Sequence, residues 1–467
     1  MSEPYRNLSP YRHIHFIGIG GVSMSALAST LAGWGFRISG SDRSDSATLQ
    51  ELRDRGIETQ IGQRAENING ADLVVYTTAI REDNPELKAA RAAGCPVWHR
   101  SELLAAVLGS QRRIAVAGTH GKSSTTSMIA TVLAELGQDP TLFVGGTSRN
   151  FGSNYHLGNG KIAVFEACES DGSFLHYGGC SQVITSIEPD HLDVHETFEK
   201  LVQCFCDFAA SADPEGFLVH AAGHPAVERA AACSPARLVT YGLGHAADYM
   251  ARDVRPDGDG VLFTPTVRGE PLEPVRLPVI GAHNIRNALA ALAVATELGL
   301  DPRQAALALT SYKGVERRFE QLGTVAGYDV IDDYAHHPTE VRATLKAARK
   351  HYGPRLLVIF QPHLYSRTRD LLAEFARAFR DARVVVIADI YAAREQPGDG
   401  GGISGADLAR VIQERQPGKQ VVYLPSFEEI QRFVQETARP GDLVLTMGAG
   451  DIRRLGETLI RDAAVKA

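Results

Sequence analysis

The chain has 467 residues, which is too long for a single hydrophobic core and predicts about three domains at roughly 150 residues each. Hydrophobic residues make up 44% and charged residues 22%, the profile of a soluble globular protein. The net charge of -7 argues against a general binder of nucleic acid or of anionic membranes.

No segment is typical of membrane insertion or of a secretory signal. The apolar stretch 288–300 is the nearest to a membrane span, and Glu297 interrupts it. The first residues form no apolar signal region, and the six cysteines contain no C-x-x-C pair. We therefore expect a cytoplasmic protein with reduced thiols, a monomer or a homodimer, without nucleic-acid binding or membrane insertion.

The first third of the chain alternates strands with helices. Strands are expected at 13–19, 37–41 and 71–78, and helices at 23–34, 47–55 and 84–93. This alternation builds a parallel sheet with right-handed crossovers. It predicts a Rossmann-like domain over residues 1–110, with Gly18, Gly20 and Gly21 in the first strand–helix turn.

Two further blocks follow. In the second, 111–315, a strand at 113–117 leads to a helix at 125–136, and a less regular, antiparallel stretch is expected near 240–275. The third block, 316–467, again alternates, with strands expected at 329–331, 356–360, 384–387 and 443–447. We expect an α/β chain of three domains: a P-loop domain in the middle and a second Rossmann-like domain at the C-terminus.

The loop at 118–124 has the composition of a phosphate-binding loop. Glycines allow backbone N–H groups to surround phosphate oxygens, and the N-terminus of the following helix favours anions. Lys122 would neutralise phosphate charge, and the next hydroxyl would bind Mg²⁺. The general G-x-x-x-x-G-K-[ST] motif requires glycine where Val116 stands, so the chain has the shorter form G-T-x-G-K-[ST].

Together with other motifs in the same order, this short loop resembles the Mur ligase family of peptidoglycan synthesis, and within it the branch that attaches L-alanine. The matching segments are 18–25, 39–42, 82–86, 118–126, 166–174, 188–193, 283–287, 314–319, 332–340, 361–370 and 448–451. They span nearly the whole chain. The resemblance implies a UDP-sugar-binding first domain, an ATP-binding middle domain and a last domain that completes the nucleotide and amino-acid sites.

The activity that the resemblance implies is ATP-dependent ligation of L-alanine to the lactyl carboxylate of UDP-N-acetylmuramate. A carboxylate is a poor electrophile, so amide formation requires activation, here as an acyl phosphate made from the ATP γ-phosphoryl group. ATP and a carboxylate together concentrate negative charge. The site therefore needs cationic side chains and a metal ion, Mg²⁺ or Mn²⁺.

The resemblance also assigns residues. As catalytic groups it implies Lys122, Glu166, His191 (after a strand expected at 184–187) and Arg318, and as metal ligands Ser123, Glu166 and His191. ATP would be bound by Gly118, Thr119, His120, Gly121, Lys122, Ser123, Ser124, Asn284, Asn287, Arg318 and Asp333. The UDP-sugar would contact Gly18, Gly20, Gly21, Ser41 and Asp42, and the amino acid Tyr334, His336 and Arg367.

The chain departs from the family pattern at two places. The family often has arginine after Gln-Pro-His, where this chain has Leu364, so one cation for the amino-acid carboxylate is missing while Arg367 is kept. Ser123 and Ser124 stand where the family more often has two threonines, which preserves the metal-binding hydroxyl.

Three other functions are compatible with parts of the sequence: an oxidoreductase, a non-catalytic sensor and a second kind of ligase. An NAD oxidoreductase would use the first glycine turn with Asp42 on the ribose, but Ser23 leaves G-x-G-x-x-G incomplete. A non-catalytic sugar-nucleotide sensor would not need Lys122, Glu166 and His191. The alternative within the family is a recycling ligase that attaches a tripeptide to UDP-N-acetylmuramate; segment 361–370 favours the L-alanine enzyme.

Overall fold

The computed structural model describes residues 7–393, 395–396, 398 and 400–466. The chain divides into two compact units. The first comprises Met1–Met250, Val267–Glu270 and Ala288–Ser311, and the second Ala251–Thr266, Pro271–Asn287 and Tyr312–Ala467. Over the described residues, every helix is too short or too polar to cross a lipid bilayer.

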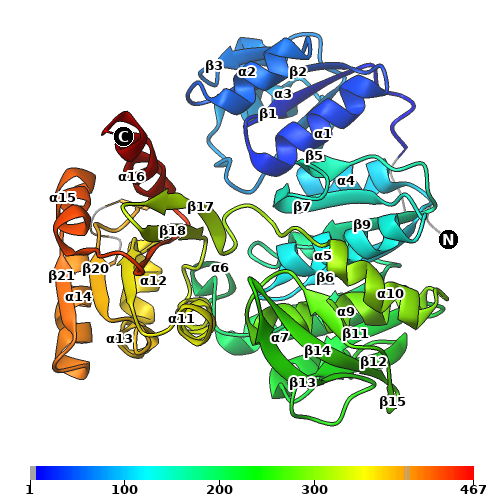
Figure 1. Cartoon of the computed structure of the whole chain (residues 1–467). Helices are drawn as coiled ribbons and strands as arrows, with labels where there is room; N and C mark the ends of the chain where they lie inside the picture. Colours follow the sequence, from blue (N-terminus) through cyan, green and yellow to red (C-terminus); the bar gives the residue numbers. More distant parts are fainter. Residues whose placement is uncertain (1–6, 394, 397, 399, 467) are drawn as a thin grey trace. The chain divides into compact units, whose positions relative to one another are not determined.

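The first unit begins with a parallel five-stranded sheet in the order β3-β2-β1-β4-β5 (Figure 1). Its strands are β1 (His13–Ile17), β2 (Arg37–Asp42), β3 (Glu58–Ile61), β4 (Leu73–Tyr76) and β5 (Val97–His99). Its helices are α1 (Val22–Gly33), α2 (Ala47–Asp54), η1 (Ala65–Ile68), α3 (Pro85–Ala92) and α4 (Arg100–Leu108). Apolar residues of α1, α2 and α4 share one core with Ile14 and Phe16, while α3 packs with Ile17 on the other face. This two-sided burial follows from the side-chain alternation along β1.

The second sheet of this unit has the parallel order β12-β11-β10-β6-β9-β7, and β8 pairs antiparallel with β7. Its strands are β6 (Arg112–Ala117), β7 (Thr141–Ser148), β8 (Ser153–His156), β9 (Ile162–Glu166), β10 (Ser181–Ile184), β11 (Phe217–Ala221) and β12 (Arg237–Gly242). The helices are α5 (Lys122–Glu135), η2 (Ser173–Tyr177), α6 (Leu192–His195), α7 (Phe198–Ala210), α8 (Pro225–Ala231), α10 (Pro302–Ala308) and η3 (Leu309–Ser311). Helix α9 (Ala282–Glu297) is divided: its residues up to Asn287 belong to the second unit and those from Ala288 to the first.

Four more strands follow in the region 249–277, where the chain passes back and forth between the two units. They are β13 (Tyr249–Asp257), β14 (Gly260–Val267), β15 (Glu270–Pro271) and β16 (Val275–Leu277). β14 and β16 pair antiparallel, so the antiparallel stretch expected near 240–275 is confirmed.

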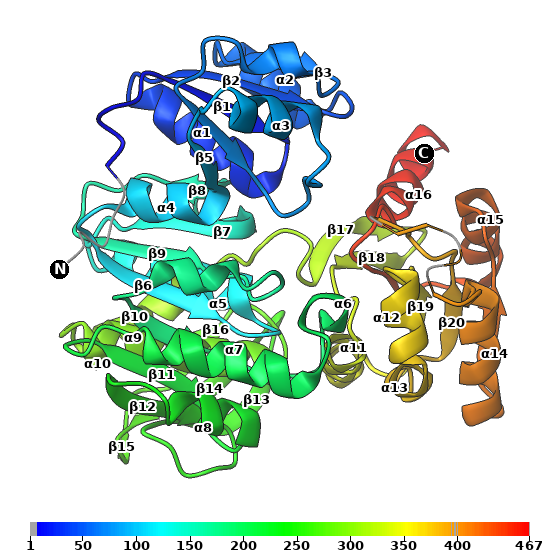
Figure 2. The same ribbon diagram turned by 180° about the vertical axis from the view of Figure 1, so that it is seen from behind.

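The second unit contains a six-stranded sheet in the order β17-β18-β22-β19-β20-β21, in which only the β17–β18 pair is antiparallel (Figure 2). Its strands are β17 (Glu320–Val325), β18 (Tyr328–Asp333), β19 (Leu356–Phe360), β20 (Val384–Ile387), β21 (Gln420–Tyr423) and β22 (Leu443–Met447). Its helices are α11 (Pro338–Tyr352), α12 (Tyr365–Asp370), α13 (Leu372–Ala378), α14 (Gly405–Arg415), α15 (Phe427–Thr437) and α16 (Arg453–Lys466). α11, α13 and α14 share one core with the sheet, and α15 and α16 share another on the opposite face.

Most expected boundaries differ from the structure by one or two residues, and two elements near the phosphate loop differ by three. The helix expected at 125–136 begins at Lys122, so the phosphate loop is shorter and its lysine and serines lie in the first turn. The strand expected at 184–187 is Ser181–Ile184 instead, which leaves a longer irregular segment before His191.

His99 supports α4 in a way that depends on its protonation. Its Nδ1 accepts a hydrogen bond from the Ser101 N–H at 3.4 Å, and Glu102 completes a capping box. Burial, followed by the neighbouring Arg100 guanidinium, lowers the pKa of His99 to about 4, although Asp171 acts to raise it. The folded chain therefore holds the imidazole neutral.

Because the pKa of His99 lies below the ordinary value of 6.5, the unfolded chain takes up this proton first. The stability linked to His99 is present in full above pH 6.5 and is expected to fall as the pH drops toward 4. His99→Asn keeps a capping acceptor without titrating, so its stability should depend less on pH over this window. Denaturant unfolding of both proteins at pH 7 and 4.5 measures the difference. Equal losses would contradict the assignment.

Candidate functional site

The phosphate loop joins β6 to α5 through two glycines that no other residue could replace without strain. A Cβ on Gly118 would lie 2.2 Å from Thr185 Oγ1, and Gly121, which precedes the helix, has a φ of 82°. The Thr119 N–H donates to the Ser186 carbonyl and the His120 N–H donates to Ser186 Oγ. The loop is thus fixed against the end of β10, with the N-terminus of α5 open to an anion.

Lys122 lies folded against its own loop. Its ammonium donates to the carbonyls of Gly118 at 2.6 Å and Thr119 at 3.3 Å, and to Glu169 Oε1 at 3.0 Å. Burial acts to lower the pKa of Lys122, but Glu169, with Cys168 and Glu166, raises it above its ordinary value. The lysine is therefore charged at neutral pH.

Ser123 and Glu166, two of the three expected metal ligands, lie together. Ser123 Oγ donates to Glu166 Oε2 at 2.8 Å, and the Gly145 N–H donates to the same oxygen at 2.8 Å. The contact follows from the register, because β6 and β9 are parallel neighbours and Val116 is paired with Glu166. A hydroxyl and a carboxylate at the start of a helix next to a lysine are donors that suit Mg²⁺.

Glu169 was not singled out from the sequence. Its side chain is 1% exposed and both carboxylate oxygens lie within 3.0 Å of the Lys122 ammonium. A buried carboxylate needs a cation, and an acid just beyond β9 lies beside the loop that follows the neighbouring β6. The adjacency of β6 and β9 was therefore the signal from which the Lys122–Glu169 pair could have been predicted.

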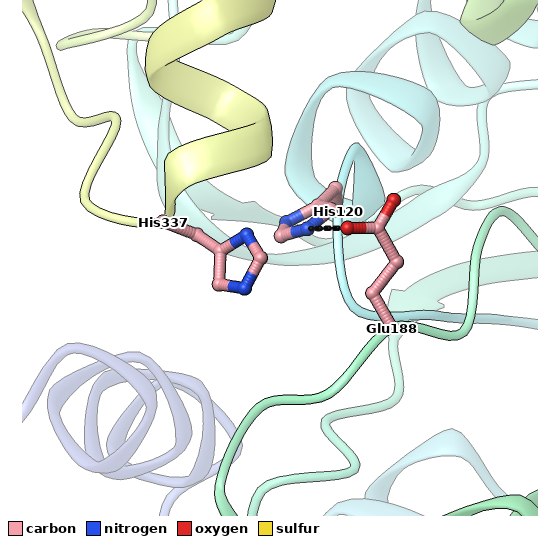
Figure 3. Close-up of side chains that lie close together, drawn as sticks. All are labelled: His120, Glu188 and His337. Atoms are coloured by element: carbon pink, nitrogen blue, oxygen red, sulfur yellow. Dashed lines mark ion pairs between the residues drawn. The ribbon is translucent and has the colours of Figure 1, made fainter. Parts of the chain in front are cut away.

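His120 and Glu188 form an ion pair, with Nε2 and Oε2 3.5 Å apart, and Figure 3 shows the ring facing the carboxylate. Both come from loops at the carboxyl ends of β6 and β10. His191 lies further along the same segment, with Nε2 3.7 Å from Asp190 Oδ2 and a left-handed backbone (φ 53°). Its role as a metal ligand stays a prediction.

In the first sheet, the glycine turn is tied to Asp42. Asp42 Oδ2 accepts from the Gly20 N–H at 3.0 Å, and the backbone carbonyl of Ser41 accepts from the Gly18 N–H at 2.8 Å. The Ser41 hydroxyl is fully buried and donates to Glu86 Oε2 at 2.6 Å. Ser41 thus supports the turn from inside. The expected contact of Ser41, Asp42 and the glycines with the UDP-sugar stays a prediction.

A cavity of about 160 Å³ lies within the first unit between α1, β7 and the end of β9. It is lined by Ser23, Ala26, Leu27, Arg100, Leu104, Phe143, Val144, Gly145, Asn154, Glu166 and Cys168. Arg100, which the sequence did not single out, is its cation and lies 3.8 Å from Asp171. A carboxylate in this cavity would therefore lie near both Arg100 and the Ser123–Glu166 pair.

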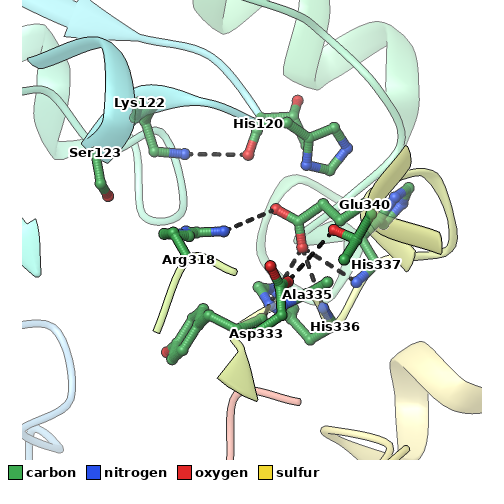
Figure 4. Close-up of polar contacts among 12 residues, drawn as sticks. His120, Lys122, Ser123, Arg318, Asp333, Ala335, His336, His337 and Glu340 are labelled. Atoms are coloured by element: carbon green, nitrogen blue, oxygen red, sulfur yellow. Dashed lines mark hydrogen bonds and ion pairs between the residues drawn. The ribbon is translucent and has the colours of Figure 1, made fainter. Parts of the chain in front are cut away.

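In the second unit, three of the expected residues, Arg318, Tyr334 and His336, lie near Glu340 in the first turn of α11 (Figure 4). Its carboxylate lies 3.7 Å from Arg318 and 3.5 Å from the ring of His336. Tyr334 packs against both, with its ring 5.2 Å from the Arg318 guanidinium and 5.4 Å from the His336 ring.

Asp333 ends β18 and is almost fully buried. Its carboxylate accepts from the Phe319 N–H at 2.9 Å and the Ala335 N–H at 2.8 Å. Burial raises the pKa of Asp333 to about 6, although the Arg318 guanidinium acts to lower it. These bonds show that Asp333 shapes the turn after β18. Its expected contact with the ATP ribose stays a prediction.

Arg367 joins the Tyr334–His336 pair through His363. Its guanidinium lies 3.1 Å from His363 Nδ1, and the His363 and His336 rings are 6.0 Å apart. The three residues expected to hold the amino acid therefore form one group, with His363 as a member that the sequence missed. Leu364 directly precedes α12, with a φ of 70°, and is 3% exposed, so its side chain is packed inside.

Asn284 and Asn287 share a face of α9, as expected from their spacing, and Asn287 Nδ2 donates to Asn284 Oδ1 at 3.3 Å. Asn284 also donates to the Ile280 carbonyl at 2.8 Å. Their contact with the nucleotide stays a prediction.

Three family models match successive parts of the chain. They are "Mur ligase family, catalytic domain" at residues 13–112, "Mur ligase middle domain" at 116–295 and "Mur ligase, glutamate ligase domain" at 317–450.

Similar full-length proteins carry one name. The UDP-N-acetylmuramate–L-alanine ligase of Sorangium cellulosum is 44% identical over 446 residues, which cover 94% of each chain. The protein of that name from Agathobacter rectalis is 44% identical over 96% of this chain and 98% of its own.

Solved structures agree. A UDP-N-acetylmuramate–alanine ligase from Thermotoga maritima has a TM-score of 0.82 and 28% identity, covering 97% of this chain and 100% of that one. A murein peptide ligase from Psychrobacter arcticus has a TM-score of 0.71 and 25% identity, covering 96% of this chain and 98% of that one.

Proposed function

The chain belongs to the Mur ligase family, and we propose that it joins L-alanine to the lactyl carboxylate of UDP-N-acetylmuramate at the expense of ATP, for peptidoglycan synthesis. The structural observation that supports this most is the arrangement at the start of α5. Lys122, which is charged, and Ser123 lie in the first turn of α5, and the Ser123 hydroxyl contacts the carboxylate of Glu166.

The reaction needs charge compensation that these residues supply. The N-terminus of α5 and the Lys122 ammonium are placed to stabilise the transferring phosphoryl group. Arg100 is proposed to hold the substrate carboxylate until it attacks the γ-phosphorus, because it is the cation that lines the neighbouring cavity. This attack displaces ADP and forms an acyl phosphate. The amine of L-alanine then attacks the acyl carbon, phosphate leaves, and the nitrogen loses a proton as the amide forms.

Mg²⁺ (or Mn²⁺) is proposed as the metal, because the donors brought together by the fold are oxygens. Ser123 and Glu166 would hold it, and His191 is proposed as a further ligand. When bound, the ion would neutralise phosphate charge.

We assign the remaining residues to the same reaction. The glycine turn with Asp42 is proposed to bind the UDP-sugar, and Asn284, Asn287, Arg318 and Asp333 are proposed to bind ATP. The linked group Tyr334, His336 and Arg367 is proposed to bind L-alanine. Domain boundaries near residues 110 and 315 are proposed to separate these roles, which the extents of the three matched models support.

The second candidate is the tripeptide-attaching ligase, which the similarity to the murein peptide ligase favours. The higher TM-score to the alanine ligase and the shared name of the full-length relatives favour L-alanine.

Phosphate release tests the reaction class. ATP turnover is expected only when UDP-N-acetylmuramate, Mg²⁺ and L-alanine are all present, because the acyl phosphate forms only on the lactyl carboxylate. Omitting each component in turn is the control. Turnover of NAD(P), or no phosphate release with the full mixture, would refute a ligase; preference for L-alanyl-γ-D-glutamyl-diaminopimelate would select the tripeptide enzyme.

A further inference from the structure

Six cations surround one hollow on the side of the C-terminal sheet that α11, α13 and α14 cover. The hollow, of about 930 Å³, is lined by Arg342, Lys346, Arg349, Ala376, Arg377, Arg380, Asp381, Arg415 and Gln416. We call it the basic groove. Asp381 is the one carboxylate among the described residues that line it, in a chain whose overall charge is -7. The groove is therefore a local reversal of the protein's charge.

The groove is built on a fixed framework. α11, α13 and α14 lie next to one another (Figure 1) and bury Leu345, Phe375 and Leu408 in a common core. Gln416 Nε2 donates to the Ala376 carbonyl at 2.7 Å, and Lys419 Nζ donates to the Arg380 carbonyl at 3.2 Å, which fixes the ends of α13 and α14. The cations are thus presented by a rigid surface.

Helix ends explain only half of these charges. Arg349, Arg377 and Arg415 lie in the last turns of their helices, where cations offset the helix dipole. Arg342 and Lys346 lie earlier on α11 and, four and then three residues apart, share one face of the helix with Arg349. Arg380 lies two residues after the end of α13.

The positive charges of the groove are weakly compensated. Arg349 lies 3.7 Å from Asp381, whereas the part of the chain that the structure describes records no ion pair for Arg377, Arg380 or Arg415. Burial, and then the nearby Arg349 guanidinium, lower the pKa of Lys419. A cation at the margin of the groove therefore already experiences repulsion from it.

The groove lies apart from the group around Glu340. Arg342, the lining residue nearest to Glu340 on α11, follows it by two residues, which turns its side chain about 200° around the helix at 3.6 residues per turn. Glu340 lies in the first turn, with Arg318 and His336, whereas Arg349 lies in the last. The groove thus adds a second charged surface to the same domain.

The lining indicates the class of ligand. Guanidinium groups match phosphate oxygens two at a time, and five of the six cations are arginines. No aromatic residue among the described lining residues offers a stacking surface for a base, and none supplies the large apolar anchor of a protein interface. We propose that the basic groove binds a small polyphosphate, a compact ligand with several linked phosphate groups and no aromatic part.

The test is calorimetric titration of the full chain with sodium tripolyphosphate and, separately, with citrate. In Arg377→Gln/Arg415→Gln, binding at the groove should weaken about 10-fold or more, because each lost contact is worth up to a factor of ten. The matched control is Arg432→Gln/Arg461→Gln, which removes two exposed cations from α15 and α16 on the other face of the sheet. This control should bind within about twofold of the wild type.

Tripolyphosphate can also occupy the phosphate loop, and that contribution is the same in all three proteins, so the groove is measured as the difference. Thermal unfolding and phosphate release should be unchanged in the groove variant, which shows that it is folded. Identical tripolyphosphate titrations for the wild type and the groove variant would overturn the proposal. Equal weakening for citrate would show a surface for anions in general and would also overturn it.

Discussion

Replacing Lys122 with alanine is expected to lower kcat about 100-fold or more, because a positioned cation or donor at the developing charge is typically worth that much. Lys122 is the first residue of α5, and its ammonium folds back to 2.6 Å from the Gly118 carbonyl and is charged in the folded chain. Steady-state phosphate release with saturating substrates measures the loss.

Lys122→Ala should also lower the stability of the protein, because Lys122 is the partner of a buried carboxylate. Without the lysine, the Glu169 carboxylate, 1% exposed, is left buried without the ammonium that contacts both of its oxygens. Removing one partner of such a pair costs about 3–5 kcal/mol, so Lys122→Ala should also unfold at a lower temperature.

Lys122→Ala/Glu169→Gln separates the two effects. The glutamine removes the uncompensated charge at nearly the same volume, so the melting temperature should recover toward that of the wild type while kcat stays low. A double variant that regained both stability and turnover would show that Lys122 is a structural residue. Near-normal kcat in the single variant would show the same.

The central strands were predictable because burial on both faces leaves an uninterrupted apolar run. β19, β20 and β22 match the expected ranges 356–360, 384–387 and 443–447. Edge strands do not have this pattern. β3 (Glu58–Ile61) and β17 (Glu320–Val325) contain few apolar residues and are mostly exposed or half-buried, so no apolar run marks them and neither was predicted as a strand.

The site was predictable where motif and strand end coincide. Ser123 and Glu166 lie together because β6 and β9 are neighbours in one parallel sheet. Glu169 and Arg100 were missed because each pairs with a residue far away in sequence, and single-residue patterns do not report such pairs. His363 contacts Arg367 only four residues later, so the spacing of these two residues was the signal that could have found it. The hydroxyl of Ser41 donates to Glu86 inside the fold, a contact that its sequence motif does not reveal, and its expected contact with the UDP-sugar stays a prediction.

Arg367→Ala is expected to raise the KM for L-alanine about 10- to 150-fold, because a charge-assisted contact to the α-carboxylate contributes on the order of 1.5–3 kcal/mol. Arg367 is buried in the group that contains His363, His336 and Tyr334, and Leu364 offers no second cation. The KM values for ATP and UDP-N-acetylmuramate should barely change. Kinetics with each substrate varied in turn measure this.

The matched control is Arg369→Ala, an exposed arginine on the same helix whose guanidinium contacts Asp370, and its KM for L-alanine should equal that of the wild type. Leu364→Arg restores the cation common in the family, but Leu364 is 3% exposed and has a φ of 70°, so the new side chain would have to leave a packed position. We therefore expect no decrease in the KM for L-alanine from this change. An Arg367→Ala variant that lost ATP affinity with an unchanged KM for L-alanine would show that the amino acid binds elsewhere.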